Sequence, residues 1–309
     1  MVPGQSLNDL TSGLFKALGK ELMDFDPDIV LVQGDTNSAF AGALAGFYHG
    51  CKIVHVEAGL RTYDNRSPFP EEMNRKLIGQ IADWHFAPTH RARTNLLEEG
   101  IFRDKIITTG NTIIDALNYG LEKITTEQCE EVEKVQKILA EPKQPFLLAT
   151  IHRRENQGEP IIKICSALRE IAKRSGLQII VPVHPNKTFA AIIEAELSGI
   201  PGIKLIDPVP YPGFLWLMQN CSLILTDSGG IQEEASGIGK HVILLRENTE
   251  RAEAVTGGFV YKAGSNVDLI VKLSLELLEK KSDPVQKAVF GKGDASKKIL
   301  EFFKDLQMD

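Results

Sequence analysis

The chain has 309 residues, of which 43% are hydrophobic and 25% charged, which is an ordinary globular composition with room for one large or two medium domains. Its net charge of −6 disfavours a broad basic surface for nucleic acid, so any phosphate would be held by a few local cationic groups. The 4 cysteines show no C-x-x-C spacing and no metal pattern, which predicts reduced thiols in a cytoplasmic protein without a metal site. No apolar run is long enough to cross a bilayer, and we expect no membrane partner.

Segments that predict strands alternate along the chain with segments that predict helices. A helix is expected over about 6–25 and a helix of small residues over 39–50, and a polar helical stretch spans about 115–143. Strands are expected at 28–35, 52–59, 84–89, 105–111, 145–152, 177–185, 203–208, 222–230 and 241–246. This rhythm predicts an α/β protein with two Rossmann-like, doubly wound domains, at 1–122 and 123–293, and a cleft between them.

Polar residues follow several of the predicted strands directly. They are Asp35, Glu57, His152, His184 and the pair Asp227-Ser228. Ligands of open parallel sheets bind outside the carboxyl ends of the strands, so these positions predict an active site. A single Asp or Ser there is equally typical of a helix cap, but the recurrence at five strand ends favours the site.

The stretch "LTDSGGIQEEA" (225–235) predicts a strand, a turn with two bare glycines and a helix. Ser228 or Asp227 would cap the helix, and a helix N-terminus beginning at Gly229 and Gly230 favours an anion such as a diphosphate. Glu234 would lie roughly 9–10 Å along the axis, where an attached ribose could offer its diol to a carboxylate. A tight strand–helix turn is the alternative explanation of the glycines.

The stretch 57–76 combines prolines, carboxylates and arginines, and Glu71-Glu72 open a predicted helix. With Asp35 and Glu57 at neighbouring strand ends, up to three carboxylates would converge and could supply an acid and a base for proton removal beside a weakly activated carbon. Acidic residues in a first helical turn also simply complement the dipole, which leaves the choice between Glu71 and Glu72 open.

The segment "IHRREN" (151–156) places His152 and Arg153 at another predicted strand end. A histidine followed by arginines can donate hydrogen bonds to a leaving phosphate, and arginine suits bidentate phosphate contacts. A surface charge run with a capping histidine is the alternative.

Seven segments together resemble the non-hydrolysing UDP-N-acetylglucosamine 2-epimerases. They occur in the family's order over nearly the whole chain: "QGDT", "VEAGLRT", "SPFPEEMNR", "TGNTIIDAL", "HRREN", "LTDSGGIQEEA" and "NTERAEAV". The resemblance implies the GT-B arrangement of two Rossmann-like domains, with a C-terminal helix at 294–309 returning to the first domain. It also implies reversible epimerisation of UDP-GlcNAc to UDP-ManNAc without a cofactor or metal, by anti elimination of UDP and re-addition through bound 2-acetamidoglucal.

The resemblance carries roles to individual residues of this sequence. It implies acid/base or electrostatic roles for Asp35, Glu57 and Glu71, and a contact of His152 with the diphosphate. The positions that match UDP-sugar binding are Ser228, Gly229, Gly230 and Glu234, with Arg75, Arg153, His184 and Arg251 at further matching positions. A homodimer and a part in cell-surface polysaccharide biosynthesis are implied in the same way.

Some segments depart from the family pattern. Ala252 stands where the family has proline, and "FGKGDAS" (290–296) departs from the usual order, which weakens any phosphate or hinge role there. The first five residues look like an internal stretch of the family, so the resemblance implies further βα units with a "GTRPE" loop before them. Without these units the strand at 28–35 would be an open edge. We then expect weak UDP binding through residues 123–289, little or no epimerase activity, and poor solubility or non-native oligomers.

Three other functions share parts of the pattern. A GT-B glycosyltransferase would share the nucleotide helix, but it would not need carboxylates clustered around "QGDT" and "PFPEE". A hydrolysing epimerase would release free ManNAc and UDP, and an inactive fragment would bind UDP without turnover. An assay for epimerisation without any acceptor separates the glycosyltransferase from the epimerase.

Overall fold

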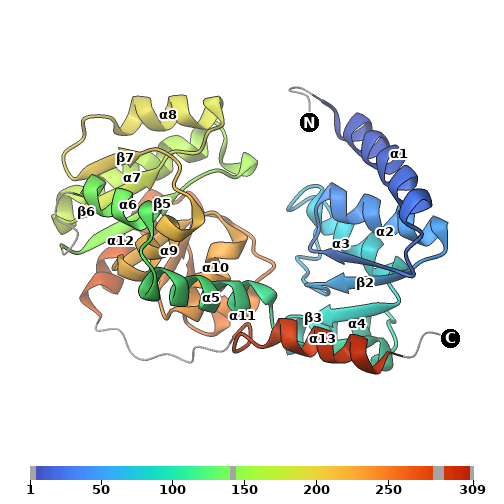
Figure 1. The fold of residues 1–309 in the computed structure, drawn as a ribbon. Helices are drawn as coiled ribbons and strands as arrows, with labels where there is room; N and C mark the ends of the chain where they lie inside the picture. The colour runs from blue at the N-terminus through green and yellow to red at the C-terminus, as the bar shows by residue number, and fades with distance from the viewer. Residues whose placement is uncertain (1–4, 140–143, 281–288, 307–309) are drawn as a thin grey trace. The chain divides into compact units, whose positions relative to one another are not determined.

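A computed structural model describes residues 5–139, 144–280 and 289–306 (Figure 1). Residues 1–112 with 290–309 form one compact unit, here unit 1, and residues 113–289 form unit 2. The boundary expected at 122/123 falls inside helix α5 (Thr112–Thr126), nearly all of which belongs to unit 2. Three expectations fall partly outside the described residues. They concern the stretch 1–4 that resembles an internal part of the family, the end of the helix expected to reach 143, and the end of the helix expected at 294–309. Among the described helices, none combines the length and the apolar character needed to span a membrane.

Unit 1 is built on a parallel sheet of four strands in the order β1-β2-β3-β4. Gln33 at the end of β1 is in register with Val56 at the end of β2, so the residues after these two strands share one edge of the sheet. The elements of the unit are α1 (Leu7–Phe25), β1 (Ile29–Gln33), α2 (Asn37–His49), β2 (Lys52–Val56), α3 (Glu71–Ile81), β3 (Trp84–Ala87), α4 (His90–Glu98), the 3₁₀ turn Arg103–Lys105, β4 (Ile106–Thr108) and α13 (Ala295–Asp305).

Helix α2 shows how local sequence sets an element of unit 1. The Thr36 hydroxyl accepts a hydrogen bond from the N–H of Ala39 at the start, and Gly50 ends the helix with a φ of 92°. A Cβ on Gly46 would lie 2.8 Å from both Ile53 and Val30. The small residues of α2 therefore let the helix lie close against β1 and β2.

Strand β1 forms an edge of the described sheet, as the sequence predicts for residues 28–35. Val32 is buried, whereas the Leu31 side chain on the opposite face is 49% exposed. The strand thus contributes one apolar face to the core and leaves its outer side unpaired within the described residues.

The C-terminal segment joins unit 1 through aromatic packing. Phe302 on α13 makes edge contacts with Trp84 and Phe86 on β3, at centroid distances of 5.6 and 5.2 Å. The N–H of Asn111 donates to the carbonyl of Phe290 at 2.7 Å, and a Cβ on Gly291 would lie 2.9 Å from the Cα of Gly110. The glycines of "FGKG" and "TGN" therefore allow two backbone segments to touch.

Unit 2 is built on a parallel sheet of six strands in the order β10-β9-β8-β5-β6-β7. Its core lies between the sheet and its helices, with Leu147 on β5, Ile164 on α7 and Ile270 on α12 fully buried. The elements are α5 (Thr112–Thr126), α6 (Glu130–Leu139), β5 (Phe146–Thr150), the 3₁₀ turn Arg154–Asn156, α7 (Glu159–Ser175), β6 (Gln178–Pro182), α8 (Lys187–Leu197), β7 (Ile203–Ile206), α9 (Tyr211–Asn220), β8 (Leu223–Thr226), α10 (Gly229–Gly237), β9 (Val242–Leu244), α11 (Ala252–Thr256), β10 (Val260–Lys262) and α12 (Val267–Glu279).

Two details differ from the sequence-based expectation. The single helical stretch at 115–143 is interrupted between α5 and α6, after Thr125 and Thr126, whose hydroxyls bond to carbonyls four residues back. Strand β10 was not predicted, because it has only 3 residues and follows two glycines. Its pairing with β9 gives it an extended form that its own sequence does not specify.

Two buried histidines should make unit 1 sensitive to acid. Burial lowers the pKa of His55 to about 3 and that of His85 to about 4. Below about pH 6.5 the unfolded chain therefore binds protons that the folded unit does not. The free energy of unfolding then decreases as the pH is lowered. Between pH 7 and pH 5, His85→Phe should lose about 1–2 kcal/mol less stability than the parent chain. Urea titrations followed by the fluorescence of Trp84, in a Trp216→Phe background, measure this difference.

The control for this prediction is His90→Gln, because His90 is exposed. This variant should lose as much stability as the parent over the same pH range. An equal loss in His85→Phe and the parent would contradict the assignment.

Candidate active site

Asp35 and Glu57 follow β1 and β2 at one edge of the unit 1 sheet. Glu57 has a φ of 65°, and its carboxylate accepts a hydrogen bond of 3.3 Å from Asn111. Gly34, between β1 and Asp35, also has a positive φ, and a Cβ there would lie 3.3 Å from Glu57 Oε2. The glycine thus lets the Glu57 carboxylate lie against the turn that carries Asp35, as the strand-end pattern predicts.

Arg75 joins Asp35 to helix α3. Its Nε donates to Asp35 Oδ2 at 2.8 Å and its Nη1 donates to Glu72 Oε2 at 2.5 Å. Asn74 adds a hydrogen bond of 2.8 Å to the carbonyl of Asp35. The first turns of α3 are therefore fastened to the Asp35 turn, and the Arg75 side chain, only 2% exposed, is committed to carboxylates within the unit. Its predicted contact with substrate stays a prediction.

Glu71 and Glu72 lie in different environments. Glu72 is fully buried, and its Oε1 accepts 3.0 Å hydrogen bonds from the N–H groups of Thr62 and Tyr63. With Arg75 on its other oxygen, Glu72 holds the "GLRTY" loop to α3. Glu71 is half-buried, and its side chain has no hydrogen bond or ion pair to another described residue. Of the two, Glu71 is the carboxylate that remains available for a ligand.

In unit 2 the "HRREN" turn is held by a carboxylate that follows β8. Asp227 Oδ2 accepts hydrogen bonds from the N–H groups of His152 and Arg153 and from Asn156 Nδ2, at 2.8 to 2.9 Å. Asp227 Oδ1 lies 3.1 Å from Nδ1 of His152. Residues 152 and 153 are thereby fixed beside the first turn of α10.

His184 follows β6 and stacks on His152. The two ring centroids are 5.7 Å apart and the ring planes differ by 16°. Burial, followed by the neighbouring His152, lowers the pKa of His184. The structure therefore brings together His152, Arg153 and His184, three predicted site residues that come from two strand ends.

The glycine pair at the start of α10 has a packing explanation as well as a possible ligand. A Cβ on Gly229 would lie 2.6 Å from Nη1 of Arg251, and one on Gly230 would lie 3.3 Å from Cδ1 of Ile113. Ser228 is the N-cap residue, but its side chain makes no capping hydrogen bond. Close packing thus accounts for Gly229, while the hydroxyl of Ser228 is left for other contacts.

The second glutamate pair, Glu233-Glu234, also separates into two environments. Glu233 is fully buried and its Oε1 lies 2.5 Å from Nε of Arg251, which in turn pairs with Glu250. Arg251 is therefore engaged within the unit, and its predicted ligand contact stays a prediction.

Glu234 accepts a 2.6 Å hydrogen bond from the Tyr211 hydroxyl. Burial raises the pKa of Glu234, although the Tyr211 hydrogen bond lowers it in part. Burial and the contact with Glu234 raise the pKa of Tyr211. The phenol therefore remains a donor that orients the Glu234 carboxylate.

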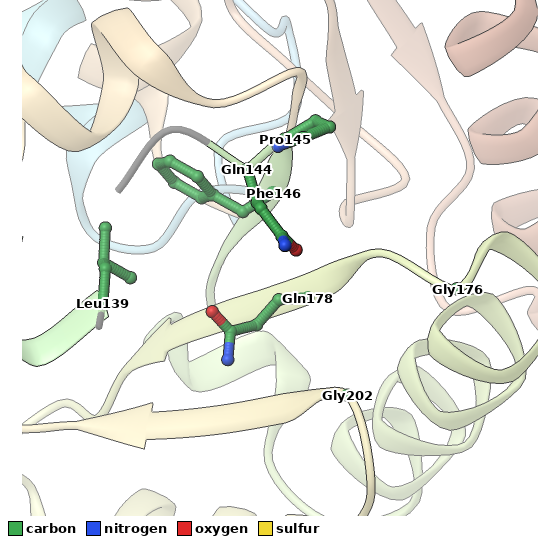
Figure 2. Close-up of a pocket in the computed structure, with 7 residues that line it drawn as sticks. All are labelled: Leu139, Gln144, Pro145, Phe146, Gly176, Gln178 and Gly202. Atoms are coloured by element: carbon green, nitrogen blue, oxygen red, sulfur yellow. The ribbon is translucent and has the colours of Figure 1, made fainter. Parts of the chain in front are cut away.

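A surface pocket of about 290 Å³ lies at the other end of the unit 2 sheet (Figure 2). It is lined by Phe146 and Gln178, the first residues of β5 and β6, together with Leu139, Gln144, Pro145, Gly176 and Gly202. Since His152 and His184 follow the last residues of the same strands, this pocket is separate from the candidate site.

The family model for UDP-N-acetylglucosamine 2-epimerase matches residues 2–304. The chain belongs to this family. The Escherichia coli K12 epimerase is 42% identical to this chain, over 99% of the chain and 83% of its own length. The Salmonella borreze epimerase is 41% identical, over 98% of the chain and 82% of its own length. The crystal structure of the Neisseria meningitidis epimerase bound to UDP-GlcNAc matches with a TM-score of 0.93 at 41% identity, covering 99% of this chain and 84% of that one. The Methanocaldococcus jannaschii epimerase in complex with UDP-GlcNAc and UDP matches with a TM-score of 0.89 at 36% identity, covering 98% and 83%.

These similarities confirm three predictions from the sequence. The family is the one that the seven segments resemble, the α/β fold class with two parallel sheets is that of the solved epimerases, and the chain is an enzyme of the epimerase family. The roles of the individual site residues are not tested by these similarities and stay predictions.

Sequence reasoning missed Tyr211 and Asn156 at this candidate site, and it missed the role of Asp227 in holding the turn at residues 152 and 153. Tyr211, Asn156 and the buried role of Asp227 appear only when strands β5 and β8 and helices α9 and α10 are brought together. The sequence predicts Asp227 as a strand-end site residue or a helix cap, but not as the partner of His152. Its position after an apolar strand was a signal, but nothing in the sequence pairs it with residue 152.

The two glutamates of unit 1 should differ in their effect on stability. Glu72→Gln removes the charge that compensates the buried Arg75 and should cost about 3 kcal/mol of unfolding free energy. Glu71→Gln, its matched neighbour, should change stability by no more than about 0.5 kcal/mol. Urea denaturation of both variants, followed by Trp84 fluorescence, compares them. A larger loss in Glu71→Gln would reverse the assignment.

Proposed function

We propose that this chain interconverts UDP-GlcNAc and UDP-ManNAc by inverting the configuration at C2 of the sugar. Membership of the epimerase family supports the reaction class. The observation that carries the ligand assignment is the arrangement around α10. There, one 9-residue helix has His152 and Arg153 fixed beside its N-terminus, and Glu234, oriented by Tyr211, six residues after the N-cap Ser228.

The diphosphate would bind at the N-terminus of α10. The unpaired N–H groups of a first turn and the helix dipole favour an anion, and the imidazole and guanidinium groups of His152 and Arg153 add donors for it. The uridine ribose would then reach Glu234, whose carboxylate accepts hydrogen bonds from the 2′- and 3′-hydroxyls. The epimerases of Neisseria meningitidis and Methanocaldococcus jannaschii bind UDP-GlcNAc in their crystal structures, which supports the same ligand.

The chemistry would be an elimination followed by an addition. A carboxylate removes the proton at C2, the C1–C2 double bond of 2-acetamidoglucal forms, and the C1–O bond breaks with its electron pair leaving on UDP. A UDP oxygen then adds back to C1, and C2 is protonated on its other face. The net reaction moves no electrons to a cofactor, so none is required.

Asp35, Glu57 and Glu71 are the groups proposed for proton transfer. Asp35 and Glu57 follow paired strands, and Glu71 opens the helix that Arg75 and Asn74 fasten to the Asp35 turn. Carboxylates held in this way are suited to general acid–base catalysis. His152 is proposed to stabilise the departing diphosphate.

The remaining expectations from the family resemblance are retained as proposals. They are a homodimer, a cytoplasmic location and the supply of UDP-ManNAc to cell-surface polysaccharide synthesis.

Deuterium incorporation tests the reaction directly. The protein incubated with UDP-GlcNAc in heavy water, with the family's preceding βα units present and without an acceptor, should form UDP-ManNAc and place deuterium at C2 of both sugars, because each passage through the glucal exchanges that proton. NMR of the sugar protons measures both products. UDP-ManNAc formed without deuterium at C2 would reject the elimination mechanism, and free ManNAc with UDP would indicate a hydrolysing enzyme.

Substitutions should separate catalysis from UDP binding. Asp35→Asn, Glu57→Gln and Glu71→Gln should each lower turnover by at least ~10²-fold, while UDP binding measured by calorimetry hardly changes.

Glu234→Ala should weaken UDP binding by about 1.5–3 kcal/mol, and Tyr211→Phe should weaken it by about 0.5–1.5 kcal/mol because the carboxylate loses its orienting donor. Tyr261→Phe, which leaves the candidate site untouched, is the matched control. Unchanged UDP affinity in Glu234→Ala would contradict the ribose assignment.

A further inference from the structure

The two oxygens of the Asp227 carboxylate have different partners. Oδ2 accepts hydrogen bonds from the N–H of His152 at 2.9 Å, from the N–H of Arg153 at 2.8 Å and from Asn156 Nδ2 at 2.9 Å. Oδ1 accepts a longer hydrogen bond of 3.2 Å from the N–H of His152 and lies 3.1 Å from Nδ1 of the His152 ring. Oδ2 therefore makes most of the contacts with the turn, while Oδ1 faces the imidazole.

The Asp227 carboxylate is fully buried, and the three N–H donors on Oδ2 favour its ionised form. Burial alone would raise its pKa, but the contacts with His152, Arg153 and Asn156 outweigh burial and lower the pKa. An ionised carboxylate can only accept hydrogen bonds, so the proton of this contact must be on Nδ1 of His152. Nε2 is then the nitrogen of the ring that is left for a ligand.

The groups that face the His152 ring come from two strand ends. Asp227 follows β8 and His184 follows β6, and Arg153 is the next residue in the chain. The N–H of Asn186 donates to Nδ1 of His184 at 3.1 Å, so the neutral His184 ring carries its proton on Nε2. The tautomers of the stacked rings are thus set by different partners, a carboxylate for His152 and an N–H group for His184.

We propose that Asp227 is the positioning residue of His152: it fixes the ring proton on Nδ1, presents Nε2 to the diphosphate of the ligand, and compensates the imidazolium charge when Nε2 is protonated. In that form Nε2–H donates a hydrogen bond to the oxygen on which UDP leaves. This inference rests on the proposed function, from which the diphosphate ligand is taken. A carboxylate that orients and charge-compensates a histidine is a recurring device of active sites.

Asp227→Asn tests the proposal. The amide oxygen can still accept hydrogen bonds from the turn, but its NH₂ group cannot accept the proton of Nδ1. The ¹⁵N spectrum of the 7 histidines shows which ring nitrogen carries the proton, and the His152 signals are identified by their loss in His152→Gln. In Asp227→Asn the His152 proton should move from Nδ1 to Nε2. UDP affinity, measured by calorimetry, should fall about 10- to 100-fold near pH 7, the scale of a lost hydrogen bond to a charged group. The pH at which UDP binding weakens should move to lower values, because the imidazolium has lost its counter-charge.

Asn156→Ala is the matched control. It removes one hydrogen bond from the same carboxylate but leaves the contact between Asp227 and His152. Stability should fall in this variant, whereas the His152 tautomer and the pH at which UDP binding weakens should stay as in the parent chain. A merely structural role of Asp227 would make the two variants behave alike.

The ¹⁵N spectrum of the parent chain tests the proposal even if Asp227→Asn does not fold. A proton on Nε2 of neutral His152 in that spectrum would overturn the proposal. Loss of UDP affinity by the same factor at every pH in Asp227→Asn would also overturn it. Neither measurement needs turnover. An absence of deuterium at C2 in wild type, with the tautomer and UDP results as expected, would therefore reject the epimerisation and leave the role of Asp227 supported.

Discussion

The site of unit 2 depends on one buried anion. Asp227 lies at the end of β8 and receives donors from the turn after β5, so the ends of two adjacent strands are joined by a single carboxylate. A buried charge is tolerated only when its partners compensate it, and here the partners are two backbone N–H groups, an amide and an imidazole. The burial that makes Asp227 costly to replace is also what makes it a rigid support for His152.

The need to compensate a buried charge also explains the two pairs of adjacent glutamates. In "PEEMNR" the second glutamate is buried against Arg75, and in "QEEAS" the first is buried against Arg251. The remaining member of each pair, Glu71 or Glu234, is left with at most one polar partner within its unit among the described residues. Each pair thus consists of a carboxylate that holds the fold and a neighbour that can meet a ligand.

The arginines of the site are more structural than their charge alone suggests. Arg75 and Arg251 are largely buried and bind carboxylates of their own units. Removing such a partner leaves an uncompensated charge, which is strongly destabilising. Arg75 holds Asp35 and α3 in one arrangement, so it supports the carboxylates proposed for proton transfer even without a contact to substrate.

The sequence alone determined the alternation of strands and helices, because buried parallel strands are short apolar runs that helices must separate. It also determined which polar residues follow the strands, since the carboxyl ends of parallel strands meet at one edge. The 3-residue strand β10 and the break between α5 and α6 were missed, because pairing and local side-chain bonds decided them. Only the tertiary structure decided that Glu72 rather than Glu71 is buried, that Gly229 makes room for Arg251, and that Asp227 faces His152. The physical reason is the same in each case: the partner is distant in the sequence or on a different element, and burial is a property of the packed chain rather than of the residue.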